Sequence, residues 1–336
     1  MKKNKYITFT EPGKAVLREA EESAPQDTKG MIFIRNLLSL VSPGTELAFF
    51  EGTHSDLKAG IRKYPTASGY SSVGRVERTG SGVNDIKPGD LVMAMCGHCE
   101  SAWVRTYDKV PDGLTPEKAV FAILGAIALH GVREANLIFG QNVLVSGLGA
   151  IGQLATRLSR ITPIDKLVTA DVYQFRLEMA KAAGADYSLN AGESDFSKHV
   201  MEITGGRGFD VIIEASGNPQ ALVGSLEYAA MRGKIIVLGC PHGEVGIDFY
   251  RNLQKKELSI TGSYQPNCPE METPYYPWSK KRNRELVMEY QLRDKLDFSP
   301  LITHRGQPGM AQEFYDILSK EKNRCITAVF EWNSGE

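Results

Sequence analysis

Two different patterns of hydrophobic and polar positions follow one another along this chain of 336 residues. From residue 1 to about 115, short apolar runs are separated by turn residues, which is typical of β-strands. The clearest runs are GMIFIRNLLSLV, SSVGRVERTG, GDLVMAM and SAWVRTYDKV. This stretch therefore predicts a compact, mostly antiparallel β domain.

The pattern changes after residue 114. Thr115 can cap a helix that has Pro116 in its first turn. The segment 119–137 is apolar on most faces and predicts a buried helix. Four runs rich in Val and Ile follow, NVLVSG, KLVTAD, DVIIEASG and GKIIVLG, with helical segments such as AIGQLATRLSRI and FRLEMAKAAGA between them. Continuous apolar strands that alternate with helices predict a parallel sheet covered on both faces.

Beyond residue 265 the chain is first proline-rich and irregular and then helical, and it ends in a predicted helix, turn and strand. The length alone favours two domains of about 100–200 residues each. The fold class predicted is α/β, with a β domain joined to a doubly wound parallel-sheet domain.

Composition narrows the function classes. Lys and Arg total 39 against 40 for Asp and Glu, so the net charge is −1, and nothing indicates nucleic acid or an anionic membrane as a partner. The basic N-terminus lacks the apolar core of a signal peptide, and no apolar run approaches the ~20 residues of a membrane span. Five cysteines, mostly far apart, do not form a secreted disulfide framework. We expect a cytoplasmic protein with reduced thiols and a small-molecule substrate.

The segment NVLVSGLGAIGQLATRL contains a G-x-G-x-x-G motif directly between a predicted strand and a predicted helix. In this context the motif predicts a dinucleotide-binding turn. The first glycine permits the tight turn, the second lets the backbone approach a pyrophosphate, and the third allows close packing of helix and strand. The helix N-terminus offers unpaired N–H groups to the anion. The predicted cofactor-binding turn comprises Gly147, Leu148, Gly149, Ala150, Ile151 and Gly152.

The second predicted strand ends at Asp171, close to the expected ~20 residues after the motif. A carboxylate at this place accepts hydrogen bonds from the ribose hydroxyls of the adenosine and repels a 2′-phosphate. NAD is therefore favoured over NADP. Arg176 complicates this preference, since its guanidinium could stack on adenine, pair with Asp171 or contact a phosphate.

The next two predicted strands end in EASG and LGC. Residues at the carboxyl ends of parallel strands border the ligand crevice. Ser216, Gly239 and Cys240 are therefore expected to line the nicotinamide half of the cofactor site, although ordinary strand-end turns explain them as well.

Nearly the whole chain resembles the medium-chain dehydrogenase/reductase family, on the segments GTELAFFEG, SGYSSVGRVERTGSGVNDIKPGDLV, GLGAIG and LITHR. The resemblance implies a GroES-like catalytic domain over 1–118, a Rossmann NAD-binding domain over 119–265 and a return to the catalytic domain over 266–336. It also implies a homo-oligomer, dimer or tetramer.

Within that family the sequence looks most like the polyol and sugar dehydrogenases, in which zinc polarises the substrate oxygen. The first zinc ligand matches the neighbourhood of Ser42, the histidine ligand matches Tyr70, and the later ligand falls near Ile123. None of the three is a good zinc ligand. The four-cysteine loop for a second, structural zinc is also absent, so a zinc-free member is predicted.

A dehydrogenase without zinc still needs a group that takes the hydroxyl proton. Tyr70 is the leading candidate, because the resemblance places it where the metal-binding histidine points into the cleft; it could equally plug the vacated metal pocket. Thr45 matches the Ser or Thr that passes the substrate proton toward solvent, and Glu46 matches an acidic residue behind the metal. His98 is a further acid/base or orienting candidate.

Four functions compete. The first is a zinc-independent, NAD-dependent dehydrogenase of a secondary alcohol in a polyol, sugar or cyclitol. The second is a zinc-free quinone or enone reductase, which Asp171 disfavours because such enzymes generally use NADPH. The third uses tightly bound NAD for transient oxidation of a sugar, and the fourth is an NAD-binding protein without catalysis.

The stretch CGHC at 96–99 matches a disulfide-exchange centre in sequence. Such a centre needs a helix N-terminus to lower the pKa of its first thiol, whereas a strand is predicted here. No second cysteine pair lies nearby to complete a zinc site. Cys96 and Cys99 are therefore interpreted as bystanders, and His98 between them as the side chain that matters.

Overall fold

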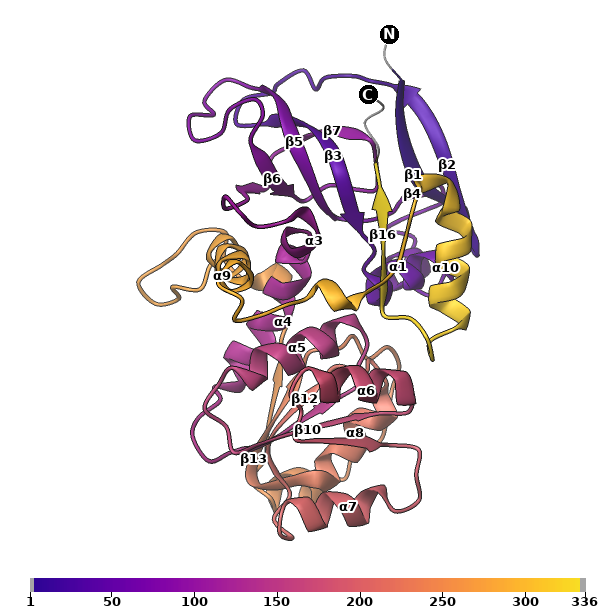
Figure 1. Cartoon of the computed structure of the whole chain (residues 1–336). Coiled ribbons are helices and arrows are strands. Elements are labelled where there is room, and N and C mark those ends of the chain that lie inside the picture. Colours follow the sequence, from indigo (N-terminus) through magenta and orange to yellow (C-terminus); the bar gives the residue numbers. More distant parts are fainter. Residues whose placement is uncertain (1–2, 333–336) are drawn as a thin grey trace. The chain divides into compact units, whose positions relative to one another are not determined.

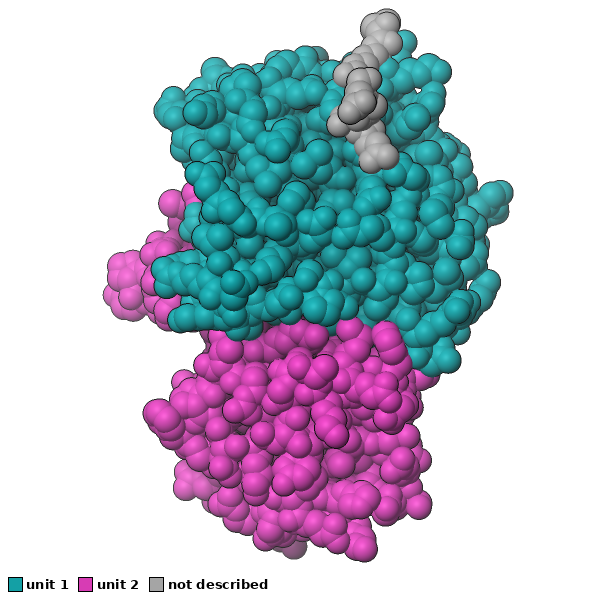
Figure 2. Space-filling view, viewed as in Figure 1, with its two compact units in different colours: residues 1–123, 284–336 teal, residues 124–283 magenta. Residues whose placement is uncertain are grey.

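The computed structural model describes residues 3–332, and the chain divides into two compact units (Figures 1 and 2). Unit 1 consists of residues 1–123 and 284–336, and unit 2 of residues 124–283. The chain passes from unit 1 to unit 2 at residue 124 and returns to unit 1 at residue 284, inside a helix.

Unit 1 is a β structure made of two sheets. The smaller sheet has the order β2-β1-β4 and the larger β15-β16-β3-β5-β6-β8, with β7 also paired to β3. All pairs are antiparallel except β15 with β16. The predicted antiparallel β domain is therefore confirmed. The strands are β1 (Lys3–Glu11), β2 (Lys14–Glu21), β3 (Ile32–Leu40), β4 (Thr66–Ala67), β5 (Ser71–Thr79), β6 (Leu91–Ala94), β7 (Ser101–Val104), β8 (Tyr107–Lys109), β15 (Ile302–Gly306) and β16 (Thr327–Glu331).

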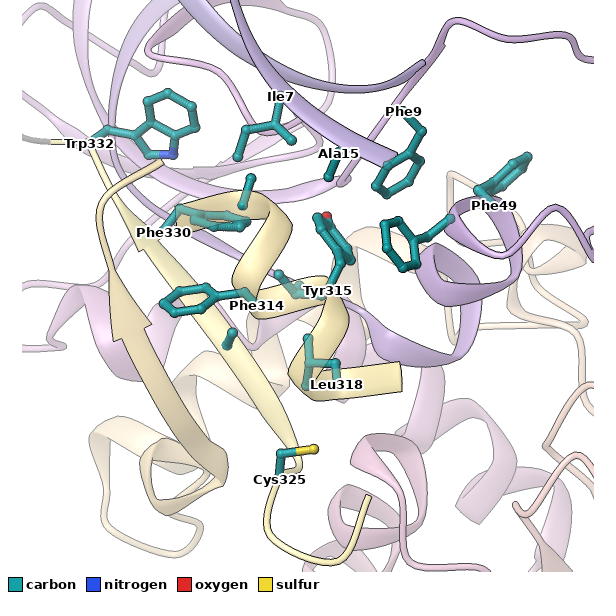
Figure 3. Packing of buried hydrophobic residues seen from close by; sticks show 14 residues of the cluster. Ile7, Phe9, Ala15, Phe49, Phe314, Tyr315, Leu318, Cys325, Phe330 and Trp332 are labelled. Atoms are coloured by element: carbon teal, nitrogen blue, oxygen red, sulfur yellow. The ribbon is translucent and has the colours of Figure 1, made fainter. Parts of the chain in front are cut away.

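A hydrophobic core joins both ends of the chain in unit 1 (Figure 3). Phe9 of β1 packs edge-on against Tyr315, and Phe330 stacks on Phe314. Burial of such aromatic side chains contributes about 1.5–3 kcal/mol each. The helices that contribute to this core are α1 (Pro43–Phe50), α2 (Ser55–Lys58) and α10 (Ala311–Lys320), and unit 1 also contains the short helix α3 (Pro116–Ala119).

Unit 2 is built on one parallel sheet of order β11-β10-β9-β12-β13-β14. The four predicted strands are present, and β11 and β14 extend the sheet at its two edges. The strands are β9 (Asn142–Ser146), β10 (Lys166–Asp171), β11 (Tyr187–Asn190), β12 (Phe209–Glu214), β13 (Ala229–Val237) and β14 (Ser259–Gly262). Helices α5 (Ala150–Arg160), α6 (Gln174–Ala182), α7 (Phe196–Ile203) and α8 (Pro219–Tyr228) connect them in turn.

Two helices pass through the boundaries of the units. They are α4 (Ala122–Ala135), which matches the predicted buried helix, and α9 (Lys280–Leu292). Short π and 3₁₀ turns complete the described chain at 249–254, 265–267, 299–301 and 308–310. Across residues 3–332, the structure contains no helix of the length and apolarity that a membrane crossing requires.

Candidate active site

The predicted glycine turn lies between β9 and α5 in unit 2. Gly147 has a positive φ of 85°, and a Cβ atom there would lie 2.4 Å from the backbone N and Cα atoms of Ser216. A Cβ on Gly152 would lie 1.8 Å from the carbonyl oxygen of Gly147. Both positions thus require glycine, because the turn, the helix and the end of β12 pack in direct contact.

Asp171 at the end of β10 closes the glycine turn. Its Oδ2 accepts a 2.7 Å hydrogen bond from the backbone N–H of Leu148, and its Oδ1 accepts one of 3.0 Å from Tyr173. The Nη1 atom of Arg176 lies 3.8 Å from Oδ2, and its Nε is buried without a hydrogen-bond partner. The Asp171 carboxylate therefore lies against the glycine turn, and Arg176 lies beside it.

The ends of β12 and β13 complete the same edge of the sheet. The buried Glu214 accepts hydrogen bonds from the backbone N–H and the hydroxyl of Ser216, which fixes the turn after β12. Burial raises the pKa of the Glu214 carboxyl. Gly239 donates its N–H to the Glu214 carbonyl at 2.8 Å, and Ser216 and Cys240 are exposed.

This edge suits a dinucleotide. Strand β9 has β10 on one side and β12 on the other, which is the switch point at which ligands bind in doubly wound sheets. Gly149 is the N-cap residue of α5 and offers no side-chain hydrogen bond to the helix, and the atom closest to the place of its missing Cβ is 4.0 Å away. The N–H groups of this helix terminus can therefore bind a pyrophosphate, and the Asp171 carboxylate can accept a hydrogen bond from a ribose hydroxyl.

In unit 1, two of the residues at the resembled zinc-ligand positions lie in contact. The hydroxyl of Tyr70 donates a 2.6 Å hydrogen bond to Oγ of Ser42, the residue that precedes α1. Ser42 is buried and Tyr70 is half-buried. A phenol and an alcohol in contact can hold or transfer a proton.

The buried carboxylate of Glu46 holds this pair in place through the backbone of Ser42. Glu46 is 2% exposed, and its Oε1 accepts a 2.7 Å hydrogen bond from the backbone N–H of Ser42. Its Oε2 accepts hydrogen bonds from the Tyr315 hydroxyl at 2.5 Å and from His98 Nε2 at 3.0 Å. Three donors compensate the loss of water around the carboxylate. Burial and the Glu46 carboxylate raise the pKa of Tyr315 well above its usual range, so Tyr315 stays a donor.

His98 is 1% exposed, and both of its ring nitrogens have partners within unit 1. Nδ1 lies 2.7 Å from Oγ of Ser39, which accepts the indole N–H of Trp332 at 2.8 Å. The Ser39 hydroxyl proton is then available to Nδ1, which leaves Nε2–H to donate to Glu46. In this arrangement the His98 ring links Ser39 to Glu46.

The His98 ring also packs against the chain that carries Tyr70. A Cβ atom on Gly69, whose φ is +75°, would lie 2.7 Å from three atoms of that ring. The backbone N–H of His98 donates to the Ser68 carbonyl at 2.9 Å. His98 therefore holds both partners of the hydroxyl pair, Tyr70 through Gly69 and Ser42 through Glu46, as a positioning residue.

Thr45, the remaining candidate, lies apart from this network, as do three other histidines and Arg305. Thr45 is exposed on α1, and His54 stacks on Phe49 and caps α2. In unit 2, Nδ1 of the buried His130 lies 3.2 Å from the Tyr276 hydroxyl. His304 and Arg305 lie on β15, where Arg305 pairs with Glu117 and Glu331.

Sequence analysis missed Ser39, Tyr315 and Trp332. Tyr315 and Trp332 meet Glu46 and Ser39 across 269 and 293 residues of chain. No local motif marks Tyr315 or Trp332, because Tyr315 lies in an ordinary amphipathic helix and Trp332 directly follows the last strand. Only a known pairing of the two chain ends could have found them.

Comparison with known proteins identifies the family. A model described as an alcohol dehydrogenase GroES-like domain matches residues 42–146, and one described as a zinc-binding dehydrogenase matches residues 150–280. The D-guloside 3-dehydrogenase of Escherichia coli strain K12 is 30% identical over 282 residues, 81% of this chain and 80% of that protein. The chain belongs to the medium-chain dehydrogenase/reductase family. It is an oxidoreductase of the medium-chain type.

Other medium-chain dehydrogenases resemble this chain over a similar length. The L-threonine 3-dehydrogenase of Pyrococcus horikoshii is 28% identical, with 89% of this chain and 90% of that protein covered. In fold, the chain is also similar to a solved structure described as a short chain alcohol dehydrogenase from E. coli CFT073 complexed with NADH, with a TM-score of 0.82 at 20% identity and with 98% of this chain and 99% of the other covered. At that identity the likeness concerns the fold.

The medium-chain family includes zinc enzymes, but the donor set in this chain does not fit zinc. The hydroxyls of Ser42 and Tyr70 occupy two of the resembled ligand positions, and the third is the buried aliphatic Ile123. Zinc sites in proteins use thiolates, imidazoles and carboxylates. Across residues 3–332, no group of three or more His, Cys, Asp and Glu side chains is arranged to hold a metal ion.

Proposed function

We propose that this medium-chain oxidoreductase is a zinc-independent, NAD-dependent dehydrogenase of a secondary alcohol in a sugar, polyol or cyclitol. The observation that carries the proposal is the hydroxyl pair of Tyr70 and Ser42 at positions where zinc-dependent relatives hold the metal. The pair supplies a proton-transfer group where the resemblance expects a Lewis acid.

The preference for NAD rests on Asp171. Its carboxylate lies at the end of β10, with Oδ2 on the backbone N–H of Leu148 in the glycine turn. A ribose with free hydroxyls can donate to such a carboxylate, whereas a 2′-phosphate would be repelled by it. The turn 147–152, Arg176, Ser216, Gly239 and Cys240 are the residues that would hold the cofactor. When bound, NAD accepts or returns the hydride.

The chain's own residues handle the proton. In the direction of carbonyl reduction, the Tyr70 hydroxyl turns from Ser42 and donates its proton to the substrate oxygen, and the Ser42 hydroxyl, reprotonated from water, donates its own proton to the phenol oxygen. In the direction of alcohol oxidation these transfers reverse: the Tyr70 oxygen takes the proton of the substrate hydroxyl, passes its own proton to Ser42, and Ser42 releases one to water. Glu46 and His98 keep Ser42 and Gly69 in place.

The substrate class follows from the resemblance to polyol and sugar dehydrogenases and from the name of the D-guloside 3-dehydrogenase, a relative that acts on a sugar derivative. We further propose a cytoplasmic homo-oligomer with no nucleic-acid or membrane partner. Support for oligomers comes from β14, an edge strand of the sheet, where Ile260 is 40% and the nearby Tyr264 59% exposed.

The proposal is tested by measuring turnover with protein whose metal content is known. Chelator-dialysed protein, with its zinc content measured in the same sample, is assayed with NAD and NADP against sugars, polyols, cyclitols and enones. The proposal expects oxidation of a secondary alcohol with NAD and no gain when zinc is added. Faster turnover of an enone with NADPH would favour a quinone or enone reductase. NAD that is released by denaturation but not by dialysis would favour transient oxidation of a sugar.

A further inference from the structure

The structure changes the interpretation of Cys96 and Cys99. Their Sγ atoms lie 3.4 Å apart, although a strand, β7, follows them as predicted. The Nδ2 atom of Asn36 on β3 lies 3.6 Å from Sγ of Cys96 and 3.8 Å from Sγ of Cys99, and it donates to the Cys99 carbonyl at 2.8 Å. The two thiols therefore face each other at a fixed place.

The pair has a buried and a more accessible member. Cys96 is buried, whereas Cys99 is half-buried. The hydrogen bond from Cys99 lowers the pKa of the Cys96 thiol, and the same bond raises the pKa of Cys99 well above its usual range. A polarised thiol with a second thiol in contact is the arrangement of an oxidisable dithiol.

We propose that Cys96 and Cys99 are an oxidation site that forms a reversible intramolecular disulfide with hydrogen peroxide. The Cys96 thiol gives up its proton as its sulfur attacks one peroxide oxygen, the O–O bond breaks, and the departing hydroxide takes that proton and leaves as water. Cys99 then attacks the sulfur of the Cys96 sulfenic acid, and a second water leaves. Two thiols are oxidised by two electrons, and the peroxide is reduced to two waters.

Closure of this disulfide acts on the positioning residue that lies between the cysteines. The sulfur separation must shorten from 3.4 Å to about 2.05 Å, which pulls on residues 97 and 98. His98 has no room to adjust, since its ring packs against Gly69 and bonds to Ser39 and Glu46. Oxidation therefore loosens the Tyr70–Ser42 pair. This consequence for activity rests on the proposed function; the oxidation itself does not.

The oxidation is tested by mass spectrometry on the full-length protein. Trypsin releases both cysteines in one peptide, residues 79–105, because the Lys87–Pro88 bond resists cleavage. After hydrogen peroxide this peptide should lack two hydrogen atoms and resist alkylation, and dithiothreitol should restore both thiols. Cys99→Ser should prevent this change, whereas Cys325→Ser, at a buried cysteine elsewhere in unit 1, should leave it intact.

The effect on the site is tested without a substrate by hydrogen exchange. Peptides that cover residues 42–46 and 69–71 should exchange faster in the oxidised wild type and at the same rate in peroxide-treated Cys99→Ser. Once a substrate is known, oxidation should lower turnover about tenfold or more, reversibly, since misplacement by ~1 Å can cost two orders of magnitude.

Three outcomes would overturn the inference. The first is that both thiols of peptide 79–105 remain intact after peroxide treatment. The second is that the oxidised protein shows unchanged hydrogen exchange at residues 42–46 and 69–71, and the third is that the two cysteines bind zinc stoichiometrically. The peptide mass and the exchange rates do not depend on any substrate. These two measurements can therefore contradict the oxidation site while the dehydrogenase proposal stands, or support the oxidation site while the dehydrogenase proposal fails.

Discussion

The Nε2 atom of His98 lies 3.0 Å from Oε2 of Glu46, at a place where neither residue is more than 2% exposed. A buried carboxylate that loses one of its donors keeps the full cost of its desolvation. The pair therefore matters for stability first and for catalysis through the residues that it holds.

His98→Ala is expected to lower the free energy of unfolding by about 3–5 kcal/mol, because it leaves Glu46 with two donors and opens a space beside Gly69. Urea unfolding followed by circular dichroism measures the change. His199→Ala, on the surface of α7, is the matched control and should change stability by about 0.5 kcal/mol or less. Equal effects of the two substitutions would contradict the assigned network.

Tyr315→Phe should cost about 1.5–3 kcal/mol at neutral pH, the contribution of a hydrogen bond to a charged group. The substitution should also change how the free energy of unfolding falls at alkaline pH. Burial and Glu46 raise the pKa of Tyr315 in the folded state, so its contribution is complete below the unfolded pKa of about 10 and is lost as pH rises above that value.

The wild type should therefore lose more stability than Tyr315→Phe between about pH 8 and about pH 10.5, measured by urea unfolding at both values. Tyr275→Phe removes a hydroxyl from a tyrosine that is 97% exposed, and it should behave as the wild type. Parallel pH curves for wild type and Tyr315→Phe would show that the phenol at position 315 does not titrate as assigned.

Asp171→Asn is expected to weaken NAD binding about 10- to 100-fold and to strengthen NADP binding, because the amide can still accept from Leu148 but carries no charge. Isothermal titration calorimetry with both cofactors measures the ratio of the two dissociation constants. Arg176→Ala is the informative partner, since it removes the cation and keeps the carboxylate. If the wild type binds NADP more tightly than NAD, then Arg176, and not Asp171, determines the cofactor preference.

Tyr70→Phe should lower kcat about 10²- to 10⁴-fold with little change in KM, the effect of losing a general acid or base. Ser42→Ala should cost less, because Tyr70 keeps its own hydroxyl. Tyr64→Phe loses a comparable hydroxyl in the same unit, one bonded to the Phe49 carbonyl, and should retain activity. Full activity in Tyr70→Phe would show that Tyr70 only fills the space that the metal occupies in zinc-dependent relatives.

The cofactor edge could be predicted because its determinants are local. Gly147, Gly152 and Asp171 lie within 25 residues of one another, and the strand-turn-helix context of the glycines is visible in the hydrophobic pattern. Strands β11 and β14 escaped prediction because each has four residues, and neither has a continuous apolar run.

The network in unit 1 could be predicted only in part. The resemblance placed Ser42, Glu46 and Tyr70 in one region, but the aromatic donors to Glu46 and Ser39 come from the other end of the chain. The contact between Cys96 and Cys99 also escaped prediction. Secondary structure around a CGHC segment does not determine the separation of its sulfur atoms, which here depends on Asn36 of β3.

Strand β16 imposes an order on folding during synthesis. It pairs with β3, and its Phe330 packs in the same core as Ile7 and Phe9, so unit 1 cannot complete its core until residues near 330 have left the ribosome. Unit 2 is continuous from 124 to 283 and has all six of its strands by then. The nascent chain therefore carries an incomplete N-terminal β-sheet, in which Ile7 and Phe9 lack their C-terminal partners, while the parallel sheet assembles.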